Sequence, residues 1–178
     1  MASFVLCRLD YCNVALTGLP KHHIDRLQSV LHAAARPIFA KRKHEHVTPL
    51  LRDLHWLRVP ERIEYKLALL VLRCLHSMAP SYLADDIQRV ADIDDRRRLR
   101  SASMAALVVP PTRCSTLGDR AFPVAAARFW NSLPFAVTSS PSLTVFKRSI
   151  KNIFACQIIW QLNVNVTCHS SLFDYTSR

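Results

Sequence analysis

Glycine is scarce in this chain, with 2 residues among 178, whereas proline occurs 10 times. Gly-rich phosphate loops and Gly-x-Ser-x-Gly nucleophile elbows are therefore excluded, because both motifs need closely spaced glycines. A β-barrel with many tight turns is also disfavoured, since such turns depend on glycine. The balance instead favours helices that begin at prolines and are separated by short connections.

Long hydrophobic runs are also missing, because no window reaches the roughly 20 apolar residues that a membrane-spanning helix needs. The first six residues are apolar, but Arg8 and Asp10 interrupt the segment, so we recognise no secretory signal. The cysteines are therefore expected to be reduced thiols, and Cys74 lies in an apolar helical run, as a core residue would. We expect a cytoplasmic or nuclear chain with no membrane partner.

Basic charge is what the chain has in excess: 24 Lys and Arg against 13 Asp and Glu give a formal net charge of +11. Such a charge attracts polyanions, chiefly nucleic acid or an anionic membrane surface, and of these we expect nucleic acid. A solvated face, or a remnant of a larger protein whose other parts carry the acid, has the same composition. Trp56 and Trp130 lie among apolar residues at helical spacing, so core packing is favoured over stacking on bases. Local basic groups supply the predicted phosphate contacts, which are Lys41, Arg42, Lys43, Arg97, Arg98, Lys147 and Arg148.

Helical periodicity predicts a mainly α fold, arranged as an irregular helical bundle. The best helix opens at Pro60, and its apolar residues recur every three or four positions. An apolar stretch bounded by prolines indicates a short strand over 104–109 and at most a β-hairpin over 104–117. Other helices are predicted after Lys21, at Thr48 (as N-cap) with Pro49, over Pro80 to Val90, over Phe122 to Trp130 and after Ser140-Pro141.

The same patterns divide the chain into four regions. They are a helical region over 1–91, a basic linker over 92–103, a region over 104–154 with short strands and two helices, and a tail over 155–178. The tail is rich in Ile, Val, Asn, Thr and Ser without a stable period, so we expect weak structure and poor order there.

Side chains grouped for catalysis are not recognised. Asp85 and Asp86 invite comparison with the aspartate pair that binds metal ions in polymerases, but Leu83 replaces the aromatic residue of that motif. No cysteine pair stands near His44 and His46 at metal-ligand spacing. We interpret the aspartates as a polar helix end and the histidines as surface residues, and we assign no catalytic residue, metal ligand or cofactor.

Ordered blocks over residues 3–154 carry a resemblance to one known sequence type. In this order they resemble the C-terminal part, beyond the polymerase, of reverse transcriptases from jockey-like and related LINE (non-LTR) retrotransposons. The set is far more specific than any single block in it. The blocks are 8–13, 18–20, 27–28, 33–36, 46–57, 62–66, 79–83, 118–122, 126–134 and 142–147.

The resemblance implies a non-catalytic fragment of a polyprotein whose endonuclease and RNA-directed DNA polymerase lie upstream, and we recognise neither of them in this chain. It begins close to Met1, inside a block typical of the family, so we expect a gene fragment. The leading interpretation is an accessory region that packs beside the upstream polymerase domain and contacts element RNA. The alternative is a purely structural or pseudogene-derived segment with no activity of its own. An enzyme is the least favoured interpretation.

Overall fold

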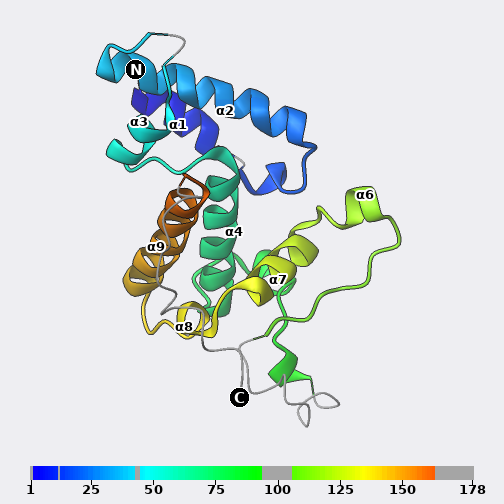
Figure 1. Cartoon of the computed structure of the whole chain (residues 1–178). Coiled ribbons are helices and arrows are strands. Elements are labelled where there is room, and N and C mark those ends of the chain that lie inside the picture. Colours follow the sequence, from blue (N-terminus) through cyan, green and yellow to red (C-terminus); the bar gives the residue numbers. More distant parts are fainter. Residues whose placement is uncertain (1, 12, 43–44, 94–105, 163–178) are drawn as a thin grey trace.

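A computed structural model of the chain describes residues 2–11, 13–42, 45–93 and 106–162 (Figure 1). It is mainly helical, as predicted. Among the described residues, no single helix has both the length and the hydrophobicity that are needed to cross a bilayer. The α-helices are α1 (Ala2–Asp10), α2 (Lys21–Ala35), α3 (Thr48–Asp53), α4 (Val59–Leu75), α5 (Ser81–Ala84), α6 (Ser115–Gly118), α7 (Phe122–Ser132), α8 (Phe135–Thr138) and α9 (Leu143–Leu162). The 3-10 turns are η1 (Asn13–Leu16), η2 (Arg36–Phe39) and η3 (Val90–Asp92).

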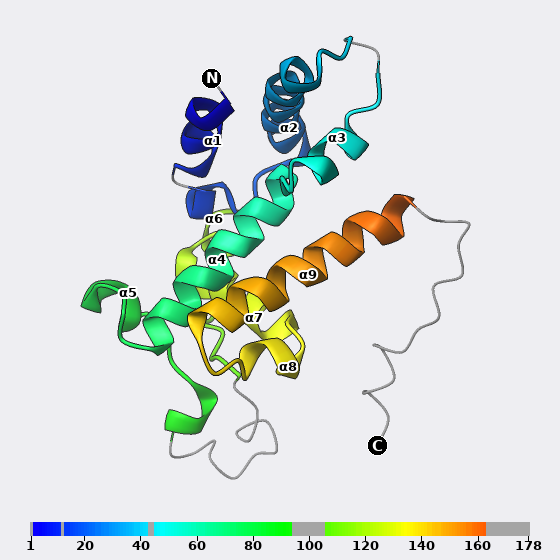
Figure 2. The same ribbon diagram turned by 90° about the vertical axis from the view of Figure 1, so that its left-hand side faces the viewer.

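Helix α4 lies between the two halves of the fold, with α1 to α3 at one end and α7 to α9 along its side (Figures 1 and 2). It begins at Val59, one residue before the predicted start at Pro60. Pro60 fits the first turn, and the Glu61 side chain accepts a hydrogen bond from the Arg58 backbone N–H at 2.9 Å. Helix α4 packs against η1, α2, α7 and α9. Its apolar surface is therefore covered on several sides by this chain.

Two apolar clusters hold the helices together. The larger one joins α4 to α7 and α9 around Trp130 and Phe146, whose rings stack with centres 5.8 Å apart. The smaller one joins α2, α3 and the start of α4, and Trp56 packs against it. The predicted core positions of Trp130 and Cys74 are confirmed, since both residues are buried.

The predicted helix from Pro80 to Val90 is wrong in its extent. Only the four residues of α5 are α-helical there; a turn follows at 85–86, and the chain is then extended up to Arg89, before η3 begins at Val90. The reason is a non-local pairing: Arg89 forms an isolated antiparallel bridge with Leu107, supported by a hydrogen bond from the Val108 N–H to the Gln88 carbonyl at 2.9 Å. The expected extended segment at 106–109 thus pairs with residues before the linker, and the described residues 106–117 form no hairpin.

Two further boundaries differ from expectation. Thr48 is the first residue of α3 and Val47 takes the cap position, a shift of one residue at a proline-initiated start. Helix α9 continues to Leu162, through the first part of the predicted tail, because no proline or glycine interrupts it. The rest of that tail and positions 94–103 of the predicted linker lie outside the described residues.

The larger cluster predicts how stability responds to substitution. Phe146→Leu is expected to lower the free energy of unfolding by about 1.5 kcal/mol, because it removes ring packing at a fully buried position. The matched control Phe135→Leu, at a 57% exposed position, should change it by less than about 0.5 kcal/mol. Urea denaturation measures both, and equal effects would contradict the assigned core.

Candidate nucleic-acid interface

The structure separates the predicted phosphate contacts that it describes. Lys41 and Arg42 are exposed after η2, whereas Lys147 is half-buried and Arg148 exposed in the first turns of α9. The connection from α2 to α3 lies at one end of the molecule, and α9 starts beside α8 at the other (Figure 1). The remaining predicted contacts, Lys43, Arg97 and Arg98, lie outside the described residues.

Ion pairing differs between these two groups. The Lys41 Nζ lies 2.7 Å from the Glu45 Oε2, and the Arg42 backbone N–H donates to the Oε1 at 2.9 Å. The hydrogen bonds from Lys41 and then from Arg42 lower the pKa of the Glu45 carboxyl. Lys41 is therefore partly neutralised, while the Arg42, Lys147 and Arg148 side chains form no ion pair with another described residue.

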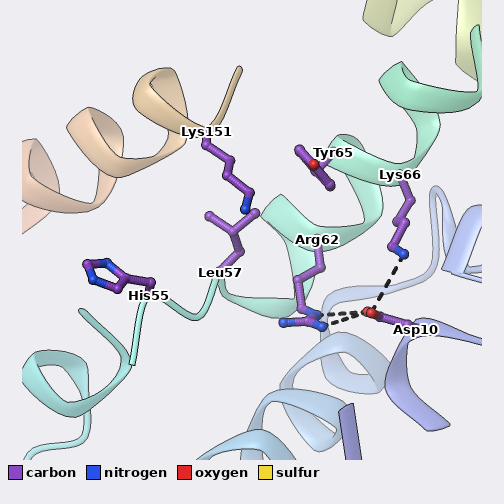
Figure 3. A pocket seen from close by; sticks show the side chains of 7 residues that line it. All are labelled: Asp10, His55, Leu57, Arg62, Tyr65, Lys66 and Lys151. Atoms are coloured by element: carbon purple, nitrogen blue, oxygen red, sulfur yellow. Dashed lines mark hydrogen bonds and ion pairs between the residues drawn. The ribbon is translucent and has the colours of Figure 1, made fainter. Parts of the chain in front are cut away.

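A pocket of about 200 Å³ gathers basic side chains that the sequence analysis did not select (Figure 3). Its walls come from the end of α1, the connection between α3 and α4, one face of α4, and α9. Segments far apart in the chain thus meet at one place. The lining residues are Asp10, His55, Leu57, Arg62, Tyr65, Lys66 and Lys151.

Local structure explains how these side chains are presented. Arg62, Tyr65 and Lys66 are spaced by three and four residues, so they share one face of α4. The end of α3 is closed by a hydrogen bond from the Trp56 N–H to the Leu51 carbonyl at 2.8 Å. In the connection between α3 and α4, His55 adopts a left-handed φ of 53°, which turns the chain toward the start of α4.

Asp10 organises the charged side of the pocket. Its Oδ1 accepts hydrogen bonds from the Arg62 Nε at 3.0 Å and Nη2 at 2.7 Å, and its Oδ2 lies 3.6 Å from the Lys66 Nζ (Figure 3). The Arg62 side chain is only 13% exposed, so water screens this pair weakly. The Lys151 Nζ lies 5.9 Å from the centre of the Tyr65 ring, within the range of a cation–π contact.

Sequence reasoning missed this pocket for a physical reason. Arg62 and Lys66 have the pattern of a solvated helix face, and Lys151 lies off the apolar stripe of its own helix. The partner that defines the site, Asp10, is 52 positions before Arg62. The one local signal was Tyr65 between two cations on the same helical face, which is weak by itself.

The other candidate metal-binding residues are not brought together in the fold. Asp85 is the C-cap of α5 and Asp86 follows it in a turn, both exposed, as a polar helix end would be. His46 is exposed, and His44 lies outside the described residues. In the part of the chain that the structure describes, no three His, Cys, Asp or Glu side chains are grouped to hold a metal ion.

Comparisons with protein-family models, with curated proteins and with solved structures find no match for this chain.

The Asp10 ion pairs predict a stability effect. Asp10→Asn is expected to lower the free energy of unfolding by about 2 kcal/mol, because it weakens hydrogen bonds between charged groups that water screens weakly. The control Glu45→Gln breaks an exposed pair and should cost less than about 1 kcal/mol. Urea denaturation of both variants measures the difference. A loss for Asp10→Asn no larger than for the control would refute the structural role of Asp10.

Two carboxyls on α4 predict a pH effect. Burial raises the pKa of Glu64, and the charge of Glu61 raises it further. Its ionised form therefore destabilises the fold. This penalty is absent below the unfolded pKa of about 4.3, grows as the pH rises from there to the folded pKa, and is complete above the folded pKa. Glu64→Gln should raise the free energy of unfolding at about pH 8 and change it little near pH 4. Equal stabilisation at both pH values in denaturation experiments would show that burial of the charge is not the cause.

Proposed function

We propose that this chain is a non-catalytic RNA-binding module, the accessory region that follows the polymerase in a LINE-type reverse transcriptase polyprotein. The observation that carries the proposal is its net charge of +11 on a helical scaffold whose described basic groups stand outside the core. Arg42 and Arg148 are exposed, and their side chains form no ion pair with a described residue. Such groups are available to phosphate oxygens.

The separation of the basic groups favours a long polyanion over a small anion. The segment with Lys41 and Arg42 and the start of α9 lie at different ends of the molecule (Figure 1). A single small anion contacts one of them at a time, whereas a chain of phosphates contacts both in succession. The ordered resemblance over residues 3–154 supports element RNA as this polyanion and the upstream polymerase domain as the packing partner.

The alternative function is a segment that packs on the polymerase domain and binds no RNA. Exposed apolar and aromatic side chains favour it, because a protein partner would bury them. Phe4, Tyr11, Tyr82 and Leu117 are each more than 60% exposed, but they are spread over four different elements or connections. RNA binding separates the two functions.

The proposal predicts how binding to single-stranded RNA responds to salt. The logarithm of the binding constant should fall linearly with the logarithm of salt concentration, by about 0.7 per phosphate contacted. Replacing Arg42 and Arg148 together by glutamine should make the slope shallower by about 1.4, as two lost contacts require. The control Arg73→Gln changes an exposed arginine outside the predicted set and should leave the slope unchanged.

Fluorescence anisotropy with a labelled RNA measures these slopes. Absence of wild-type binding at about 50 mM salt, where phosphate contacts are strong, would reject the RNA-binding proposal and leave the structural alternative. An unchanged slope in the double variant would reject these two residues as phosphate contacts.

A further inference from the structure

The pocket of Figure 3 has an uneven charge balance. Among the described residues that line it, Arg62, Lys66 and Lys151 supply three cations and Asp10 supplies the one carboxylate. Two positive charges are thus uncompensated by the lining side chains. A phosphate monoester carries a charge of about −1.5 to −2 at neutral pH, whereas a phosphodiester in an RNA backbone carries only one negative charge. The balance therefore matches a terminal phosphate better than an internal one.

Hydrogen-bond donors are available for such a group. Lys66 lies 3.6 Å from the Asp10 Oδ2, beyond a hydrogen bond, and Lys151 is held by the Tyr65 ring. Each ammonium group has three N–H donors and no acceptor. Arg62 is already committed to Asp10 through two N–H groups, so it holds the carboxylate beside Lys66 and adds positive charge to the pocket.

The volume and the walls of the pocket also fit a single phosphate group. The pocket of about 200 Å³ is smaller than the roughly 300–1,000 Å³ of sites for drug-sized ligands, so it suits one phosphate group better than a whole nucleotide. Leu57 and Tyr65 form walls with low polarity, which strengthen the attraction between ammonium groups and an anion. Lys151 projects from α9 toward these walls, while Arg62 and Lys66 extend from α4 toward Asp10 (Figure 3).

We infer that this pocket binds a phosphate monoester, with Lys66 and Lys151 as the groups that contact its oxygens. The ligand has two sources, the 5′-terminal phosphate of an RNA or a free nucleoside monophosphate. The pocket shares no residue with the phosphate contacts of the proposed function, so either assignment can fail without the other.

The test compares two short single-stranded RNAs that are identical except for a 5′-phosphate or a 5′-hydroxyl group. The wild-type chain should bind the phosphorylated RNA about tenfold more tightly, since one charge-assisted hydrogen bond contributes about 1.5 kcal/mol. Lys151→Gln should lower this ratio, because it removes one of the two ammonium groups that contact the phosphate. Lys147 lies four positions earlier on the same helix. Lys147→Gln should weaken the binding of both RNAs equally, so the ratio of their affinities should be retained. Circular dichroism checks that both variants are folded.

A second arm titrates adenosine monophosphate into wild type and Lys151→Gln by calorimetry. Binding that is lost in the variant supports the pocket even where the two RNAs bind equally, and it identifies a free nucleotide as the source. Equal binding of both RNAs together with no heat from the nucleotide would overturn the inference. A ratio that is unchanged in Lys151→Gln would overturn it as well. In both cases salt-dependent RNA binding would leave the proposed function standing.

Discussion

Covering helix α4 is the constraint on which the rest of the structure depends. Val71 and Ala68 on this helix are completely buried, and Leu67 and Leu72 nearly so, which requires neighbours on more than one side. The chain meets this requirement with α7 and α9 along one part of the helix and with α2 and η1 along another. Burial of apolar surface contributes about 25 cal/mol per Å² to the free energy of folding. A central helix that is buried on several sides therefore accounts for much of the driving force.

Part of the surface of α4 that remains uncovered lines the proposed phosphate pocket. Once the apolar residues are covered, the strip with Arg62, Tyr65 and Lys66 faces the gap between α1 and α9. Asp10 from α1 binds this strip, so the carboxylate that fastens the first helix also holds Arg62 and lies beside Lys66 in the pocket. The packing of α1 and the proposed phosphate site therefore depend on the same carboxylate.

The sequence predicts those parts of the fold that depend on local signals. Proline at a helix start and an apolar period located α4, the apolar period alone located α7, and the stripe through Phe146 and Ile150 located α9. Prediction failed where a distant segment competes with a local preference. Helix α5 is short because Arg89 pairs with Leu107 across the linker, and no pattern within 80–90 contains that information.

In the candidate interface, too, local features could be predicted from the sequence and features that depend on distant contacts could not. Runs of basic residues are visible in a sequence, and Arg42 and Arg148 are exposed where such runs place them. The pocket depends on contacts between α1, α4 and α9, and its residues look like ordinary solvated positions when each helix is read alone. Charge patterns therefore predict that a polyanion binds, and tertiary structure is needed to say where one phosphate fits.

Lysine footprinting of the full chain tests the central claim most directly, that phosphates contact basic side chains on this helical scaffold. Acetylation rates of each lysine, measured by mass spectrometry with and without a 5′-phosphorylated RNA, report which ammonium groups the RNA covers. We expect slower acetylation of Lys147, Lys151 and Lys66 in the presence of RNA and no change at Lys21, an exposed lysine outside both sites. Equal rates at all four lysines with and without RNA would contradict it.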